Sequence, residues 1–250
     1  MKRTPRSALP VVVALLALAS ASTAAASDGS GPFGVTVVAA PTAPVVRVGA
    51  LIVGGRRFCT ASVVHSPRRD LVATAAHCMR GSAVDVGFAP GYRNGRTPYG
   101  VWKVGRWFVS RGWADGRDED SDVAFAVVER RDGEAVEDAV GGNRFMAGTA
   151  TGATAVTLTG YPNSRAVPIS CTNKPRPHSR TQQRIACPGF SGGTSGSPWV
   201  NGDGQVVGVL GGHEGGGATV DVSYSVVFRA EAAALYRKAA GCGPSQMGSS

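Results

Sequence analysis

No long hydrophobic run opens this sequence. Its N-terminal apolar stretch covers residues 11–19, about half of the roughly 20 residues that a membrane-spanning helix needs. Basic residues precede the stretch, and small residues ending at Ala26 follow it. This order is typical of a secretory signal peptide. We therefore expect residues 1–26 to be removed and the rest of the chain to have no stable membrane insertion.

Cysteine and histidine are sparse, and neither is arranged as a metal site. The five cysteines all follow residue 26, which fits an oxidising compartment where disulfides persist. No two of them have the close spacing of a zinc site, and His65 and His178 have no spacing of metal ligands either. We therefore expect a secreted, extracellular protein without a metal or a cofactor.

The chain also lacks a basic run interleaved with aromatic residues, which excludes a nucleic-acid groove of the usual kind. The formal net charge is +9 and falls to +6 without residues 1–26. A charge of this size favours a solvated basic face. Only 4 of the 26 basic residues are lysines, a composition that fits a bacterium with a GC-rich genome.

Helical periodicity is nearly absent. Residues 229–240, followed by Gly241, are the one stretch with apolar residues at convincing helical spacing. Elsewhere, short β-branched and aromatic runs between Gly, Pro and Asn predict strands. These runs are 46–53, 58–64, 71–75, 101–109, 123–128, 155–160, 184–187, 197–200, 205–210 and 223–227. Two groups of strands around the polar stretch 130–142 predict an all-β chain of two antiparallel barrels or a sandwich.

Three short motifs supply the parts of a nucleophilic hydrolase. Thr-Ala-Ala-His-Cys at 74–78 places His77 at the end of a predicted strand, and Asp122 begins another strand after an acidic loop. Gly-Gly-Thr-Ser-Gly-Ser-Pro at 192–198 places Ser195 in a glycine-rich turn. Amide hydrolysis needs a hydroxyl, a base, a group that fixes the base, and donors for the developing oxyanion. The three motifs offer candidates for all four.

In this order the motifs resemble those of the chymotrypsin-like serine peptidases, and Gly-Thr-Ser-Gly-Ser-Pro is similar to the bacterial branch that includes the glutamyl endopeptidases. The resemblance covers nearly the whole chain after residue 45. It implies two antiparallel six-stranded β-barrels with a C-terminal α-helix. The implied parts are an extended segment or propeptide at 27–46, a peptidase domain at 47–240 with barrels at about 47–135 and 143–228 and a helix at 229–240, and a tail at 241–250.

The resemblance also implies a role for each residue. His77 would take the proton of the Ser195 hydroxyl and return it to the leaving amine, while Asp122 would hold the imidazole in the right tautomer. The backbone N–H groups of Gly193 and Ser195 would form the oxyanion hole. The implied activity is that of a monomeric serine endopeptidase that acts on protein or peptide substrates through an acyl-enzyme.

Neighbouring residues offer alternatives for two of these roles. Three acidic residues at 118–120 share the loop of Asp122, which we prefer because it adjoins the apolar strand and lies 45 residues after His77. Ser191 and Ser197 flank the nucleophile. Ser195 alone combines a following glycine with a preceding Gly-Thr pair.

A disulfide between Cys59 and Cys78 would match one of the family and pin the histidine loop. Cys171 and Cys187 flank a basic loop and would clamp the segment that leads to the serine. Cys242 is left over, because five cysteines cannot all pair within one chain.

Ile-Val-Gly-Gly at 52–55 copies the activation motif of zymogen-forming members, whose new amino terminus pairs with an aspartate just before the serine. Here we interpret it as a chance match. It lies only 25 residues before His77, follows Leu51 instead of a basic residue, and finds Thr194 where the aspartate would stand. A propeptide, if one exists, lies between residue 27 and about residue 47.

Substrate specificity is the least determined property. Trypsin-like members carry an aspartate six residues before the nucleophile, where this chain has Gly189. Acidic-specific relatives carry a histidine where this chain has Leu210, although His213 follows closely after Gly211. His213 is a candidate partner for a substrate carboxylate, and an exposed turn histidine beside Glu214 is an equally good interpretation.

Two other functions stay open. A protease fold can serve as a secreted binding protein without catalysis, because one fold hosts unrelated functions. Esterase action uses the same acyl chemistry, although the serine here lies late in a β-rich chain and not on a strand-to-helix elbow.

Overall fold

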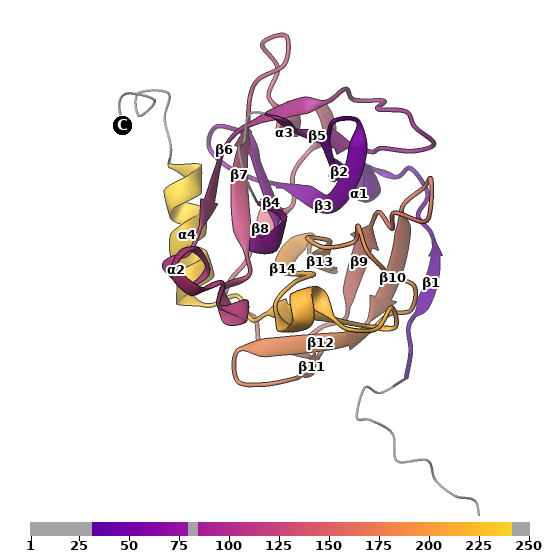
Figure 1. The fold of residues 1–250 in the computed structure, drawn as a ribbon, viewed down its shortest axis with the longest axis vertical. Coiled ribbons are helices and arrows are strands. Elements are labelled where there is room, and N and C mark those ends of the chain that lie inside the picture. The colour runs from indigo at the N-terminus through magenta and orange to yellow at the C-terminus, as the bar shows by residue number, and fades with distance from the viewer. Residues whose placement is uncertain (1–31, 80–84, 242–250) are drawn as a thin grey trace, which may run out of the picture.

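The computed structural model describes residues 32–79 and 85–241 (Figure 1). The expected signal peptide, Cys242 and the rest of the C-terminal tail lie outside the described residues. Within the described ranges, no helix has both the length and the apolar character needed to cross a membrane.

The first half of the chain folds into a closed six-stranded antiparallel barrel (Figure 1, upper half). The strand order is β2-β3-β4-β7-β6-β5. Their bounds are β2 (Val48–Val53), β3 (Arg56–Val64), β4 (Leu71–Thr74), β5 (Val86–Pro90), β6 (Trp102–Val109) and β7 (Ala124–Val128). Leu51, Phe88 and Trp102 fill the interior and are almost completely buried. Burial of these large apolar side chains is the main stabilisation of the barrel.

The second half forms two sheets. One has the order β1-β10-β9-β13-β14-β8 and the other the order β11-β12-β15. Their bounds are β1 (Val35–Val38), β8 (Arg144–Phe145), β9 (Val156–Gly160), β10 (Ile169–Asn173), β11 (Arg176–Pro177), β12 (Gln182–Ala186), β13 (Pro198–Asn201), β14 (Gln205–Val209) and β15 (Val222–Val226). The sheets meet at β14 and β15, where the Val209 N–H donates to the Ser225 hydroxyl at 3.0 Å. Trp199, fully buried, lies in the core of this half.

The N-terminal segment contributes a strand to the second half. Residues 35–38 pair with β10 in antiparallel register. The Gly34 N–H donates to the Ala186 carbonyl at 2.9 Å, and the Thr36 hydroxyl donates to the Pro188 carbonyl at 2.6 Å. Residues 34–38, expected to be an extended segment or propeptide, are therefore built into the sheet. A short helix, α1 (Ala43–Val46), then leads into β2.

The C-terminal helix α4 (Ala230–Ala240) packs beside β6 and β7 of the barrel (Figure 1). Its Leu235 joins an apolar cluster that includes Phe125 of β7 and Val209 of β14. Tyr236 stacks on Phe145 with ring centroids 4.6 Å apart. The all-β class with a closed six-stranded barrel and a C-terminal helix is thus confirmed.

The Ile-Val-Gly-Gly motif ends a β-hairpin. Ile52 and Val53 are the last residues of β2, and β3 begins at Arg56. Gly54 and Gly55 form the two-residue turn with φ values of 54° and 76°. Two residues with positive φ are the requirement of a type I′ hairpin turn, which explains why both are glycine. The motif therefore has a structural role within the barrel.

Candidate active site

His77 lies where the closed six-stranded barrel meets the second half of the chain. It follows β4 in a single 3-10 turn, η1 (Ala76–Cys78), whose flanking residues Ala76 and Cys78 are buried. A disulfide joins Cys78 to Cys59 of β3, and a second one joins Cys171 to Cys187. Both pairings are those expected from the sequence. The first one fixes the backbone on the C-terminal side of His77 against the neighbouring strand.

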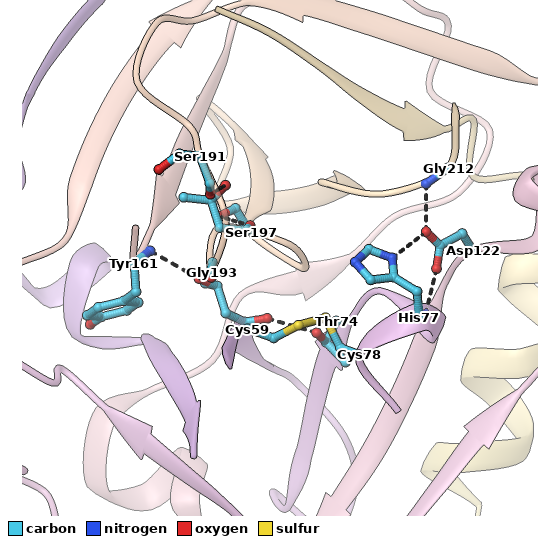
Figure 2. The surroundings of a disulfide bond; sticks show 12 residues. Cys59, Thr74, His77, Cys78, Asp122, Tyr161, Ser191, Gly193, Ser197 and Gly212 are labelled. Atoms are coloured by element: carbon cyan, nitrogen blue, oxygen red, sulfur yellow. Dashed lines mark hydrogen bonds and ion pairs between the residues drawn. A yellow bond between two sulfur atoms is a disulfide. The ribbon is translucent and has the colours of Figure 1, made fainter. Parts of the chain in front are cut away.

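Asp122 is the acidic residue that meets His77. Its Oδ2 accepts a hydrogen bond from the His77 ring Nδ1 at 2.7 Å, and its Oδ1 accepts one from the His77 backbone N–H at 2.9 Å (Figure 2). The Gly212 N–H also donates to Oδ2, at 2.7 Å. The residue is 1% exposed. Three donors on one buried carboxylate fix its orientation and hold the proton on Nδ1, which leaves Nε2 as the acceptor.

The acidic neighbours of Asp122 have other hydrogen-bond and charge partners. The Asp118 side chain caps the turn η3 (Glu119–Ser121) by accepting the Asp120 N–H. The Asp120 carboxylate accepts a hydrogen bond from the Gln182 side chain at 2.9 Å. Glu119 faces His213, with 3.6 Å between Oε2 and Nδ1. Asp122 is therefore the member of this acidic loop that contacts His77.

The loop of Ser195 packs against the strands that carry His77. The Thr60 N–H donates to the Ser195 carbonyl at 2.7 Å. Gly196 has a φ of 82°, and a Cβ at this position would overlap the Thr60 carbonyl oxygen and the Thr74 hydroxyl. The approach of the serine loop to the end of β4 therefore requires a glycine here. The result is that Ser195 and His77 lie on adjoining segments.

Within the described residues, the hydrogen bonds do not include one between the Ser195 hydroxyl and the His77 ring. Catalytic hydrogen bonds are often long or poorly aligned without a substrate and tighten in the complex. The geometry therefore brings Asp122 and His77 into direct contact and Ser195 into their neighbourhood.

The expected oxyanion donors are the amides of Gly193 and Ser195. Gly193 has a φ of 98°, and its carbonyl accepts the Thr60 hydroxyl at 2.9 Å. Among the hydrogen bonds of the described residues, neither the Gly193 nor the Ser195 amide donates to an acceptor. A backbone amide that shares its proton with no acceptor of the protein can donate to a substrate oxygen.

A cleft of about 290 Å³ opens beside His77. Its lining residues are His77, Trp113, Arg117, Glu119, Asp122, Gly212 and Gly215. Trp113 belongs to the short helix α2 (Arg111–Gly116), and its ring centroid lies 6.5 Å from that of His77. The cleft thus combines an aromatic wall with one arginine and two acidic side chains, those of Glu119 and Asp122.

The residues suggested for specificity lie in different parts of the structure. Gly189, with a φ of 88°, lies in the loop before Ser195. Leu210 is buried in the core of the second half and does not line the cleft. Gly211 packs against Asp122, where a Cβ would lie 2.7 Å from Oδ2.

His213 belongs to a ring cluster at the edge of the site. Its centroid lies 4.6 Å from that of His178 and 4.8 Å from that of Tyr224. Partial burial, and then the nearby charges of His213 and Arg184, lower the pKa of His178 below its ordinary value. The carboxylates of Glu119 and Glu214 lie within 4 Å of the His213 ring nitrogens. They would compete with a substrate carboxylate for this histidine.

A cluster of possible metal-binding atoms coincides with the disulfide. Atoms of Cys59, His77 and Cys78 lie within 4.8 Å of one another. The two sulfurs are bonded to each other and are not thiolates, the form that binds metals.

Three further residues shape the site: Trp113, Gly212 and Gln182. None of them belongs to a motif, and sequence reasoning did not find them.

The chain is similar to known serine proteases in sequence and in fold. The family model described as "Trypsin-like peptidase domain" matches residues 59–209, more than half of the chain. A comparison with curated proteins gave no match.

Three solved structures illustrate the likeness in fold. The protease Anisep from Arthrobacter nicotinovorans shares 26% sequence identity with a TM-score of 0.73, and the alignment covers 83% of this chain and all of the protease. The thermostable serine protease AL20 from an extremophilic microorganism shares 27% identity with a TM-score of 0.70 over 81% of this chain and all of AL20. A Glu endopeptidase, at 17% identity and a TM-score of 0.69, covers 85% of this chain and 99% of its own. These likenesses show the chymotrypsin-like fold.

Proposed function

This chain belongs to the trypsin-like peptidase family, and on that premise we propose that it is a secreted serine endopeptidase with Ser195 as nucleophile, His77 as general base and Asp122 as the residue that orients the base. The two disulfides support a location outside the reducing cytoplasm. Family membership supports peptide hydrolysis as the reaction class.

The observation that carries the proposal is the set of hydrogen bonds on Asp122. A buried carboxylate that accepts the ring Nδ1–H of His77 keeps Nε2 free of its proton and lets it accept the proton of Ser195. The same carboxylate stabilises the imidazolium that forms when the proton arrives. Because Gly212 and the His77 backbone also donate to it, the carboxylate is held in place before substrate binds.

Proton transfer to His77 lets the Ser195 Oγ form a bond to the carbonyl carbon of the scissile amide. The amides of Gly193 and Ser195 would stabilise the negative oxygen of the tetrahedral intermediate. Imidazolium then gives its proton to the leaving amine as the C–N bond breaks, and an acyl-enzyme remains. Water, activated by the same histidine, attacks the ester and releases the acid.

The cleft beside His77 is the proposed binding surface for the acyl side of the peptide. Trp113 offers an apolar wall next to the reacting atoms. Arg117 forms no ion pair within the described residues, whereas Glu119 lies near His213 and accepts the Glu214 N–H at 3.1 Å. Arg117 is therefore a cation in the cleft that can meet an acceptor group of the substrate.

Labelling with a fluorophosphonate probe tests the proposal. The mature secreted protein is expected to label at Ser195, and Ser195→Ala is expected to abolish both labelling and peptide cleavage. Ser191→Ala serves as the matched control, because Ser191 lies in the same loop and, like Ser195, is followed by a glycine. A folded wild-type protein that neither labels nor cleaves would support a non-catalytic binding protein instead. Cleavage of esters but not of peptides would support an esterase.

A further inference from the structure

Gln182 lies in β12 behind the catalytic residues and belongs to no motif. Its side chain is buried, with the whole residue 4% exposed. The side-chain Nε2 donates to the Glu119 carbonyl and to the Asp120 carboxylate, both at 2.9 Å. The side-chain Oε1 lies 3.5 Å from the His213 N–H, a long hydrogen bond. Because both partners of Nε2 are acceptors only, the orientation of the amide is determined.

The two segments that Gln182 joins are the two that hold Asp122. Glu119 and Asp120 belong to the turn η3, which directly precedes Asp122, and the Asp122 N–H donates back to the Glu119 carbonyl at 3.4 Å. On the other side, His213 follows Gly212, whose N–H donates to the Asp122 carboxylate. The Gln182 amide therefore bridges the segment that contains Asp122 and the segment whose Gly212 N–H binds the Asp122 carboxylate.

Gly212 makes this bridge possible. Its φ is 80°, and a Cβ at this position would overlap the Gln182 side-chain oxygen. A glycine is thus required both by the backbone conformation and by the passage of the amide beneath it. Burying a primary amide is unfavourable unless its donors and acceptor find partners, and here they do.

We propose that Gln182 is a positioning residue for the Asp122–His77 pair. It does not touch the reacting atoms. It sets the distance between η3 and the Gly212–His213 backbone. That distance in turn determines the position of the Asp122 carboxylate relative to the imidazole. This inference rests on the proposed function, in which that pair activates Ser195.

The test compares Gln182→Met with Gln183→Met. Methionine keeps the length of the side chain and removes its hydrogen bonds. Gln183 is the next residue of the same strand, is 5% exposed, and points to the opposite face, where it approaches Gly208. It is therefore a control that matches residue type, strand and burial.

The expected result for Gln182→Met is a fall in kcat of about 10- to 100-fold with KM changed by less than about twofold, because a displacement of about 1 Å at the reacting groups costs up to about 100-fold in rate. Gln183→Met is expected to keep kcat within about twofold of wild type. A second readout is the low-field proton resonance of the His77 Nδ1–H···Asp122 bond, recorded in a Ser195→Ala background. This resonance is expected to weaken or move in Gln182→Met and to stay unchanged in Gln183→Met.

The two readouts separate the failure of this inference from the failure of the proposed function. If the wild-type protein neither cleaves peptides nor labels, the peptidase proposal fails, and the resonance still tests the positioning role. Gln182→Met with wild-type kcat and an unchanged resonance overturns the inference. Equal losses in Gln182→Met and Gln183→Met also overturn it, since they indicate a general loss of packing. Should Gln182→Met not fold, Gln182→Glu replaces it. That variant keeps the size and polarity but sets a carboxylate against Asp120, so the same loss in kcat is expected, and wild-type kcat overturns the inference.

Discussion

Replacing Asp122 by asparagine tests the centre of the proposed site while keeping its shape. The carboxylate accepts three N–H donors, two of them on Oδ2. Asparagine has one oxygen and one NH₂ group, so in either orientation the NH₂ faces a backbone N–H, that of His77 or that of Gly212. The variant also loses the negative charge beside the imidazolium that forms during the reaction.

The expected loss follows from this geometry. Two unit charges about 4 Å apart at an effective dielectric constant of about 20 attract by about 4 kcal/mol. Since about 1.4 kcal/mol corresponds to a factor of ten in rate, the lost charge alone lowers kcat by about 10³-fold. A wrongly held tautomer adds to this, and the same change in a triad of this kind costs about 10⁴-fold. We therefore expect kcat to fall by between about 10³- and 10⁴-fold.

The assay measures kcat and KM with a peptide selected from a peptide-library digest by the wild-type protein, together with the rate of fluorophosphonate labelling. Asp120→Asn is the comparison variant, because an asparagine oxygen at this position still accepts the Gln182 hydrogen bond. We expect it to lose less than about tenfold. The reasoning is refuted if Asp122→Asn, folded as judged by circular dichroism, stays within tenfold of wild type, or if Asp120→Asn suffers the larger loss.

Three further predictions concern stability. Replacing Cys59 and Cys78 by alanine should lower the free energy of unfolding in urea by about 3 kcal/mol, as expected for a loop closed by residues 19 apart in sequence; an unchanged value would contradict this. Burial raises the pKa of Tyr161, so the folded state keeps a proton that the unfolded chain releases above about pH 10, and the free energy of unfolding should fall as the pH rises beyond that point. Tyr161→Phe should remove that part of the pH dependence, and an unchanged slope would show that another group causes it. A chain that starts at residue 41 should have a Tm lower by about 5 °C or more than one that starts at residue 32, because it lacks β1; equal Tm values would show that the strand adds no stability.

The sequence predicts the strands whose pattern is local. Runs of β-branched residues at β3 and β7 indicate strands because such side chains fit a pleated, half-buried surface. The pattern does not predict the strand β5, since its Gly87 and Pro90 are typical of turns. The strand β1 escapes it because a Gly- and Pro-rich segment becomes a strand only by pairing with β10, more than 130 residues away. Such pairing depends on tertiary contacts that a window of sequence does not contain.

The candidate site divides in the same way. His77 and Asp122 lie in motifs, so a resemblance finds them. The Gly212 amide and the Gln182 side chain act on Asp122 from segments about 90 and 60 residues further along the chain, respectively, and neither has a neighbouring pattern that marks it. A backbone N–H carries no residue signature at all, and a glutamine in a strand is more often a surface residue. Only the folded arrangement identifies them.

The same arrangement explains how the serine loop can be held without an activating ion pair. Thr194, 1% exposed, donates its hydroxyl to the Ser191 carbonyl at 2.7 Å, where zymogen-forming relatives would carry a charged aspartate. The Ser197 hydroxyl donates to the Thr194 carbonyl at 2.7 Å, and Thr60 does the same to Gly193. These neutral hydrogen bonds form within the chain and need no new amino terminus, whose motif instead forms the β2–β3 turn. The loop around Ser195 therefore forms these hydrogen bonds while Ile52 is still part of β2.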